Sequence, residues 1–332
     1  MKNASLTAIA GITTGHVTDE FNLTGVTVVR FAGDGARAAI SVQGAAPGTR
    51  ETDLLEPGNL VERVHAIVLT GGSAYGLDAA SGVMAALEEE GIGLPAFEDT
   101  VVPIVPAAVL FDLSVGSSTV RPDTTWGYKA AKEATDSPIP SGNVGAGMGA
   151  TVGKLLGPSQ AMKGGLGSAL VHLDSGVIVS ALVAVNAVGE VVDSASNTVI
   201  AGIRANDVGR YESAVDLALG DAAIESVAAT NTTLGLVGTN ANLNKTQLKK
   251  VSEMAHDGMA RAIRPIHTQF DGDTVFAVSM PGSEVEMTVN ADAQLNSIGI
   301  AAAKVLELAI VDAVRSAKSV GGIVASCDWQ ND

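Results

Sequence analysis

Asn231 is followed by Thr232, a hydroxyl residue whose position suits an uncommon kind of catalysis. Thr232 opens a short apolar run that predicts a strand, because the run is too brief for a helix and is bounded by polar residues. If the peptide bond before Thr232 is cut, the new α-amino group lies beside the threonine hydroxyl and can act as its base. An α-amine has an unperturbed pKa of about 7.7–8.0, so a useful fraction is neutral near pH 7. A plain turn entering a strand would carry the same residues, so the motif needs support from elsewhere in the chain.

Three further polar side chains lie where predicted strands end or begin. Asn186 follows the continuously apolar stretch 177–185, which predicts the second strand of a hairpin, covered on both faces. A buried amide at a strand end must find partners, so Asn186 is either a turn cap or a donor to an oxyanion. Asp271 and Asp273 lie in a loop that enters a predicted strand at 274–278. They form either an Asx turn or an acid pair that orients an amine or a hydroxyl.

A glycine-rich stretch at 142–154 ends in Lys154. It does not have the spacing of a nucleotide-binding loop, because Met148 stands where the first glycine belongs and Leu155 replaces the residue that would hold magnesium. The glycines instead favour close backbone approach around a site. Lys154 is then either a solvated surface lysine or a cation aimed inward.

A second glycine junction, Gly71-Gly72-Ser73, follows a short apolar strand predicted at 66–70. We expect Ser73 to cap the helix that comes next and Gly91 to end it. Helix N-termini of this kind can bind phosphate, but the full dinucleotide fingerprint is absent, which favours close backbone packing here.

With 332 residues the chain is long for one domain but short for two, which predicts one large α/β or α+β unit over residues 1–332. We find no internal repeat, linker or low-complexity segment that would divide it. A capping-box pair, Asn244 and Gln247, opens a helix predicted near 245–263. The other main elements expected are strands at 25–31 and 38–42, a short helix within 123–134 and a final helix at about 290–317.

The composition excludes several classes of function. A net charge of −16 argues against a nucleic-acid partner, because phosphate binding needs a basic face. The longest apolar run, 177–185, is too short to span a membrane. The single cysteine, Cys327, permits no disulfide within the chain, and the five histidines show no metal spacing. We therefore expect a cytoplasmic protein without metal or other cofactor.

Five features, taken in order, resemble the self-processing aminopeptidase family of DmpA and the nylon-oligomer hydrolases. The resemblance covers about residues 7–314. It rests on Gly71–Leu77, on the glycine-rich loop ending in Lys154, on Asn186, on Asn231-Thr232-Thr233 and on Asp271-Gly272-Asp273-Thr274. The Asn-Thr-Thr step and the Asp-Gly-Asp pair are most similar to the nylon-hydrolase branch. The resemblance implies an αββα four-layer sandwich of the N-terminal-nucleophile type, a chain that cuts itself, no metal, and homo-oligomers, often tetramers.

The resemblance also implies a role for each matching residue. Thr232 would be the nucleophile, first in cleavage of the Asn231–Thr232 bond and then towards substrate, leaving associated fragments 1–231 and 232–332. Lys154 would depress the amine's pKa or stabilise charge, and Asn186 would help to hold the oxyanion. Asp271 and Asp273 would orient the threonine and its amine.

Two positions, Phe111 and Tyr75, are expected to contact substrate. Phe111 stands where the nylon hydrolase has a tyrosine, so this chain lacks a phenol hydroxyl there. The predicted activity is hydrolysis of peptide or oligoamide bonds, including those of 6-aminohexanoate oligomers. One alternative is an acyl transferase resembling ornithine acetyltransferase, which also cuts itself at a threonine. Another is a non-catalytic scaffold or nucleotide-binding protein that stays intact.

Overall fold

The computed structural model describes residues 3–220, 231–280, 285 and 291–329. Two mixed sheets form its centre. The first has the order β1 (Ile12–Asp19), β2 (Thr24–Phe31), β6 (Ala66–Thr70), β9 (Ala107–Val109), β4 (Thr49–Arg50). The second has the order β12 (Gly165–His172), β13 (Ile178–Asn186), β18 (Thr232–Thr239), β20 (Thr274–Ser279), β3 (Ala36–Val42), β5 (Arg63–Val64). Neighbouring strands in these sheets are antiparallel except for the β6–β9 and β18–β20 pairs.

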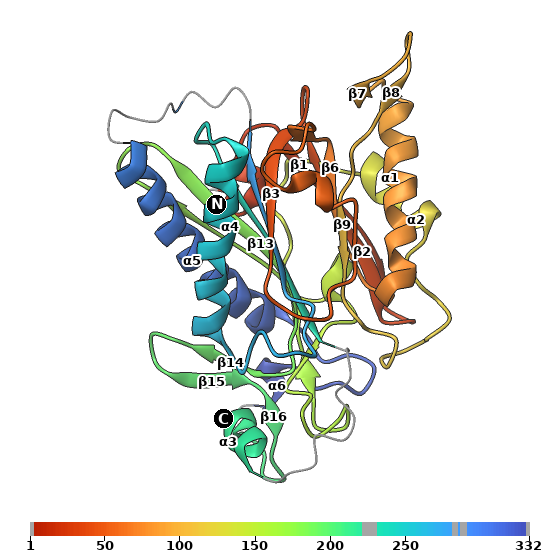
Figure 1. Cartoon of the computed structure of the whole chain (residues 1–332). Helices are drawn as coiled ribbons and strands as arrows, with labels where there is room; N and C mark the ends of the chain where they lie inside the picture. Colours follow the sequence, from red (N-terminus) through yellow and green to blue (C-terminus); the bar gives the residue numbers. More distant parts are fainter. Residues whose placement is uncertain (1–2, 221–230, 281–284, 286–290, 330–332) are drawn as a thin grey trace.

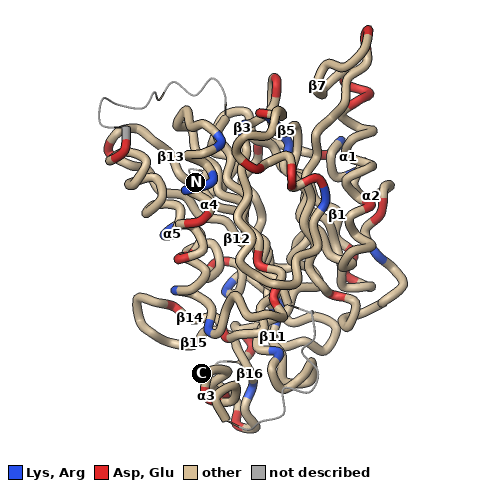
Figure 2. The backbone as a smooth tube through the Cα atoms, in the orientation of Figure 1, with Lys and Arg blue, Asp and Glu red and all other residues tan. Residues whose placement is uncertain are grey.

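Helices cover the outer faces of both sheets (Figure 1). The helices of the described residues are α1 (Ala79–Glu88), α2 (Thr124–Lys132), α3 (Ala214–Leu219), α4 (Lys245–Ala262), α5 (Ala291–Ser316) and α6 (Ser326–Trp329). Helices α1 and α2 pack on the first sheet, and α4 and α5 pack on the second. Acidic residues are spread over both sides of the molecule (Figure 2). In the described part of the chain, no helix is long and apolar enough to cross a membrane.

Three apolar cores separate the four layers. The middle core joins the inner faces of the sheets, with Leu69 from the first and Leu234 and Phe276 from the second. The outer cores lie between α1, α2 and the first sheet and between α4, α5 and the second. The helix–sheet–sheet–helix order confirms the predicted αββα sandwich.

The remaining strands form small sheets at the margins. They are β7 (Leu94–Pro95) with β8 (Val101–Val102), β10 (Thr151–Val152) with β11 (Met162–Lys163), β16 (Ile203–Arg204) with β17 (Tyr211–Glu212), and the trio β15 (Thr198–Ala201), β14 (Glu190–Asp193), β19 (Ile263–Arg264). The pair β10–β11 matters most for the site, because β10 lies at the end of the glycine-rich stretch and β11 leads into β12.

Most predicted elements are confirmed. Strand β13 is buried along almost its whole length, as its unbroken apolar run predicts, and α4 begins with the expected capping box of Asn244 and Gln247. The predicted cap at Ser73 is wrong. Gly72 and Ser73 both have positive φ, and a 3-10 turn over Ser73–Asp78 precedes α1, which starts only at Ala79. Gly91, also at positive φ, follows the end of α1 as expected.

Candidate active site

Thr232 lies at the start of β18, in the interior of the second sheet, with 5% of its surface exposed. Its hydroxyl donates a hydrogen bond to the carbonyl oxygen of Asn231, 2.5 Å away. The backbone N–H of Gly272 donates to the same oxygen at 2.8 Å. The carbonyl of the Asn231–Thr232 peptide is therefore held on one side by a hydroxyl and on another by a backbone donor. Sequence reasoning did not identify the Gly272 N–H, because a backbone group leaves no signal in residue type.

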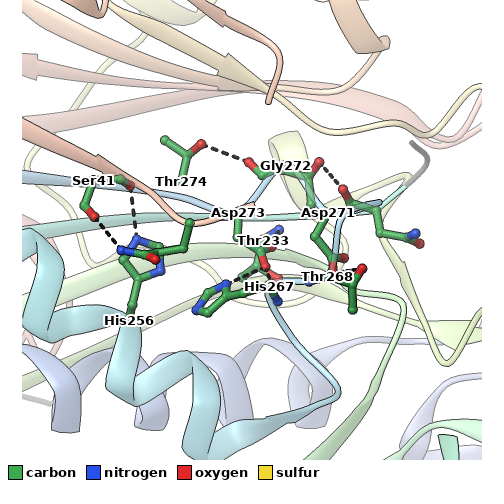
Figure 3. A network of polar contacts seen from close by, with 12 residues as sticks. Ser41, Thr233, His256, His267, Thr268, Asp271, Gly272, Asp273 and Thr274 are labelled. Carbon is green, nitrogen blue, oxygen red and sulfur yellow. Dashed lines mark hydrogen bonds and ion pairs between the residues drawn. The ribbon is translucent and has the colours of Figure 1, made fainter. Parts of the chain in front are cut away.

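Asp273 is fully buried and has each carboxylate oxygen occupied (Figure 3). Its Oδ1 accepts from the backbone N–H of Thr233 at 2.7 Å. Its Oδ2 accepts from the backbone N–H of His267 at 3.1 Å and from the Nδ1 of the same residue at 2.8 Å. The carboxylate thus links the residue after Thr232 to the turn before β20. The spacing of the histidines in the sequence gave no sign of this contact.

Asp271 is also fully buried, but among the described residues only one of its two carboxylate oxygens has hydrogen-bond partners. Its Oδ2 accepts from the N–H of Thr268 at 2.8 Å and from the Thr268 hydroxyl at 2.6 Å. Its Oδ1 has no hydrogen-bond partner among the described residues, and its backbone pairs with Asn231 in an isolated parallel bridge. Burial, followed by the negative charge of Asp273, raises the pKa of Asp271 to about 6. The Oδ1 atom, on a residue whose backbone pairs with Asn231, is a ready acceptor for a proton or an ammonium group.

Close backbone packing fixes the loop that carries both acids. A Cβ on Gly272 would come within 2.7 Å of the Thr232 hydroxyl, and a Cβ on Gly44 within 2.2 Å of the carbonyl oxygen of Asp271. The N–H of Gly44 and the N–H of Gln43 both donate to the carbonyl of Asp273. Only glycine fits at 44 and 272, since any side chain would displace the acid loop from the threonine.

Lys154 and Asn186 meet on the other side of β18. Asn186 stands directly opposite Thr232 in the β13–β18 pairing. The Nζ of Lys154 donates to the backbone oxygen of Asn186 at 2.9 Å and to its Oδ1 at 3.0 Å, and the N–H of Thr151 donates to Oδ1 at 3.0 Å. The Nδ2 of Asn186 donates to the carbonyl of Phe111 at 3.1 Å. Lys154 is therefore aimed inward, and Asn186 is firmly oriented beside the threonine.

Protein atoms packed around the Lys154 ammonium lower its pKa to about 7, although the negative charges of Asp271, Asp273 and Asp112 act in the opposite direction. The acid pair on one side of β18 and the lysine on the other thus share one electrostatic environment. Ionisable groups with shifted pKa values gather in this way at functional sites.

A second lysine, Lys163, forms hydrogen bonds with the backbone of the glycine-rich loop. It is fully buried, and its Nζ donates to the carbonyls of Gly147, Met148 and Ala150 at 3.1, 2.9 and 2.7 Å. Burial lowers its pKa to about 7. This contact fixes the loop that leads to Thr151 and Lys154. The signal in the sequence is a lone lysine within an otherwise apolar segment, 161–166, which sequence reasoning overlooked.

The two predicted substrate contacts lie in different surroundings. The carbonyl oxygen of Phe111 accepts a hydrogen bond from Asn186, so Phe111 lies at the candidate site. Tyr75 is 61% exposed, and its described contact is a stack with the Arg121 guanidinium 3.7 Å from the ring centroid. In the part of the chain that the structure describes, no cluster of three or more His, Cys, Asp or Glu residues could hold a metal ion.

The site combines a hydroxyl at a carbonyl, a donor for that carbonyl's oxygen, a buried acid pair and an inward cation. These are the components of acyl transfer by a nucleophile, with charge stabilisation at the carbonyl oxygen.

Comparison with known proteins agrees with that chemistry. Peptidase family S58 matches residues 4–326. An uncharacterized aminopeptidase of Mycobacterium leprae is 41% identical, over 97% of this chain and 93% of its own length. A 6-aminohexanoate-oligomer endohydrolase of a Kocuria species is 33% identical, over 92% of this chain and 84% of its own. The structure of the L-aminopeptidase D-Ala-esterase/amidase from Ochrobactrum anthropi, described as a variant of the Ntn hydrolase fold, superposes with a TM-score of 0.69 at 18% identity, covering 98% of this chain and 91% of that one.

Proposed function

The chain belongs to peptidase family S58 and is an amide-bond hydrolase, and from this premise we propose that it activates itself by cutting the Asn231–Thr232 bond. One observation carries the proposal. The Thr232 hydroxyl lies 2.5 Å from the carbonyl oxygen of Asn231, and the Gly272 N–H binds that same oxygen at 2.8 Å. The peptide bond before the threonine is thus already polarised next to its attacker.

Self-cleavage proceeds by transfer of the Asn231 acyl group from nitrogen to oxygen. The Thr232 hydroxyl oxygen bonds to the Asn231 carbonyl carbon, its proton passes to the unpartnered Oδ1 of Asp271, and Gly272 binds the oxyanion. The carbon–nitrogen bond then breaks, and the proton goes to the departing nitrogen. Water hydrolyses the ester and leaves an Asn231 carboxylate and a free Thr232 amine, in fragments 1–231 and 232–332.

In turnover the free amine of Thr232 serves as the base for its own hydroxyl, which attacks the substrate carbonyl. Asp271 and Asp273 then bind the new ammonium group, a role supported by the hydrogen bond from the Thr233 N–H to the Oδ1 of Asp273. Lys154 and Asn186, on the opposite side of β18, stabilise the negative charge that develops on the substrate oxygen. Water releases the acyl group and restores the amine.

The substrates proposed are short peptides, amino-acid amides and oligoamides. The names of the relatives support both classes, since one is called an aminopeptidase and another a 6-aminohexanoate-oligomer endohydrolase. The cytoplasmic location and the tetrameric assembly stay predictions.

Replacing the nucleophile tests the proposal directly. We expect Thr232→Ala to yield one uncut chain by intact mass spectrometry, whereas the wild-type protein yields two fragments whose smaller member begins at Thr232 on amino-terminal sequencing. The matched control is Thr233→Val. Thr233 is the adjacent threonine, its buried hydroxyl has no hydrogen-bond partner among the residues that the structure describes, and valine keeps its shape. This control should cut itself normally.

Two fragments from Thr232→Ala would refute the assignment of the nucleophile. A wild-type protein that hydrolyses amides while its chain is unbroken would refute the self-processing mechanism. Transfer of acyl groups to an amino acid with little hydrolysis would point to a transferase.

A further inference from the structure

Two buried charged side chains close to the candidate site have no part in the proposed mechanism. Lys163 is fully buried in β11, and Asp112, with 2% of its surface exposed, follows β9. Burial lowers the pKa of Lys163 and raises that of Asp112, and the charge of each acts on the other in the opposite direction. A buried ion needs polar partners. The partners of these two ions lead from opposite sides to one residue, Asn186.

The cationic end is linked to Asn186 through a single peptide group. The Nζ of Lys163 donates to the carbonyl oxygen of Ala150 at 2.7 Å. The N–H of the same peptide group belongs to Thr151, and it donates to the Oδ1 of Asn186 at 3.0 Å. An ammonium group at the carbonyl oxygen polarises the peptide and makes its N–H a stronger donor. Lys163 therefore acts on the Asn186 amide through one intervening peptide group.

The acidic end is linked to Asn186 through a second peptide group. The Nδ2 of Asn186 donates to the carbonyl oxygen of Phe111 at 3.1 Å, and the N–H of that peptide group belongs to Asp112. This N–H bonds to the Asp112 carboxylate and favours its charged form. The Thr24 hydroxyl and the Gly72 N–H also donate to the carboxylate, each at 2.7 Å. Three donors thus satisfy the ionised form of the acid.

These hydrogen bonds form a chain with one direction. It runs from the Lys163 ammonium to the Asp112 carboxylate, with the Asn186 amide in the middle and one peptide group on either side. Each amide accepts at its oxygen and donates from its nitrogen in the same sense, so the groups polarise one another. The Asn186 amide cannot be reversed, because its nitrogen would then face two other donors, the Thr151 N–H and the Lys154 ammonium.

Both glycine motifs of the sequence make room for the acidic end of this chain. The Gly72 N–H is one of the donors to Asp112. A Cβ on either Gly71 or Gly149 would clash with the Asp112 carboxylate. The Gly71-Gly72 junction and the glycine-rich loop therefore approach one buried carboxylate closely, which a backbone with side chains could not do.

We propose that Lys163 and Asp112 are positioning residues, which orient and polarise the Asn186 amide that stabilises the substrate oxyanion. This inference rests on the proposed function. In turnover, negative charge develops on the substrate oxygen, and a more strongly polarised N–H donor stabilises that charge more. Self-cleavage depends on the chain much less, since the Gly272 N–H binds the oxyanion in that step.

Neutral replacements test the two ends of the chain. Lys163→Met keeps the length of the side chain and Asp112→Asn keeps its outline, while each removes the charge. With an amino-acid p-nitroanilide as substrate, we expect kcat to fall about ten- to a hundredfold in each variant, with KM little changed. The loss should not exceed that in Asn186→Ala, about 10²–10³, because both residues act through this amide. Fragments should form at close to the wild-type rate.

The decisive measurement repeats both replacements in an Asn186→Ala background. A residue that acts only through the Asn186 amide has no further effect once that amide is gone. We therefore expect Lys163→Met and Asp112→Asn to change the kcat of Asn186→Ala by less than about twofold. A residue that merely supports the fold would lower kcat by the same factor in both backgrounds.

Lys245→Met is the matched control. Lys245 is another buried lysine whose Nζ donates to three backbone carbonyls, those of Leu54, Asn59 and Val61. These carbonyls do not belong to the loop that leads to Thr151. Its replacement should lower the free energy of unfolding but leave the kcat of the folded, processed protein unchanged.

Equal losses of kcat with and without the Asn186 amide would overturn the inference and leave the proposed hydrolase intact. So would failure of both Lys163→Met and Asp112→Asn to cut themselves, because these residues would then serve folding. Should only one of them fail to mature, the other decides by the same comparison. A wild-type protein that has cut itself but hydrolyses neither the anilide nor any peptide or oligoamide would overturn the proposed function and this inference together.

Discussion

In the proposed mechanism, Asp271 is the residue whose protonation controls self-cleavage most directly. Its raised pKa of about 6 means that the folded protein holds this proton at pH values where an exposed aspartate has lost it. A protonated carboxyl group cannot accept the proton of the Thr232 hydroxyl, so the ionised form is the active one.

We therefore expect the rate of self-cleavage to rise with pH up to about 6 and to level off above it. Precursor unfolded in denaturant and diluted into a series of buffers would show this on a denaturing gel.

The same pKa shift gives the free energy of unfolding the opposite dependence on pH. Because the folded pKa lies above the ordinary value of 3.8, this group's contribution to the free energy of unfolding is largest below that value and is lost as the pH rises through about 6. An Asp271→Asn variant should show neither dependence. A cleavage rate that is flat between pH 5 and pH 7 would contradict the role assigned to Asp271.

The turn between β19 and β20 carries the acid pair and forms hydrogen bonds to both carboxylates. His267 has a φ of 58°, a left-handed conformation that suits asparagine and glycine better than histidine. From that conformation its N–H and its Nδ1 both reach Asp273, whose other oxygen binds the N–H of Thr233. The strained residue thus orients the carboxylate towards the start of β18.

Replacing His267 tests whether this orientation matters. His267→Asn keeps a side-chain donor and tolerates the backbone conformation, so it should cut itself at close to the normal rate. His267→Ala lacks the donor and should be slower by about ten- to a hundredfold, the usual effect of one hydrogen bond to a charged group. Rates follow from fragment formation over time. His256→Gln is the control, because His256 packs against His267 but bonds to the carbonyl of Ser41. Equal rates of self-cleavage for the Asn and Ala variants would show that the His267 side chain does not position Asp273.

The elements differ in how far the sequence predicts them. Strands β13 and β18 and helix α4 follow from local patterns, an unbroken apolar run in the strands and a capping box in the helix, and these patterns are confirmed. The predicted cap at Ser73 failed because the positive φ at Gly72 and Ser73 leads into a 3-10 turn, and packing of that junction overrides the local preference.

The site was predictable only where residue type carries the chemistry. Thr232, Asn186 and the two aspartates stand out by type and place. The Gly272 N–H, the two bonds from His267 and the buried Lys163 do not, because each acts through backbone groups or contacts that only the tertiary fold creates. Every residue except proline has a backbone N–H, so residue type does not indicate which of these groups acts as a donor at the site.

On the scale of the whole molecule, the proposed cut falls between strands that belong to one sheet. Residues 232–332 supply β18 and β20, which lie between β13 and β3 from residues 1–231. Helices α4 and α5 of the second fragment cover the strands of both. Hydrogen bonds and an apolar core therefore join the fragments along two strand edges and one face.

We expect the two fragments to elute together in native size-exclusion chromatography and to separate only in denaturant. The uncut Thr232→Ala chain should elute at the same volume as the processed protein, because cutting one bond leaves the interleaved strands in place. Elution of the smaller fragment by itself under native conditions would contradict this account.

The interior position of β18 has a consequence for the cell. Because β18 is paired on both sides, with β13 and with β20, the proposed mechanism would release the catalytic amine only in a properly assembled fold. A nascent polypeptide still on the ribosome, or one collapsed into a wrong arrangement, would then carry no hydrolytic activity that could damage neighbouring proteins. Under this proposal the scission would act as an internal checkpoint, and the quantity of active enzyme would report the quantity that matured correctly.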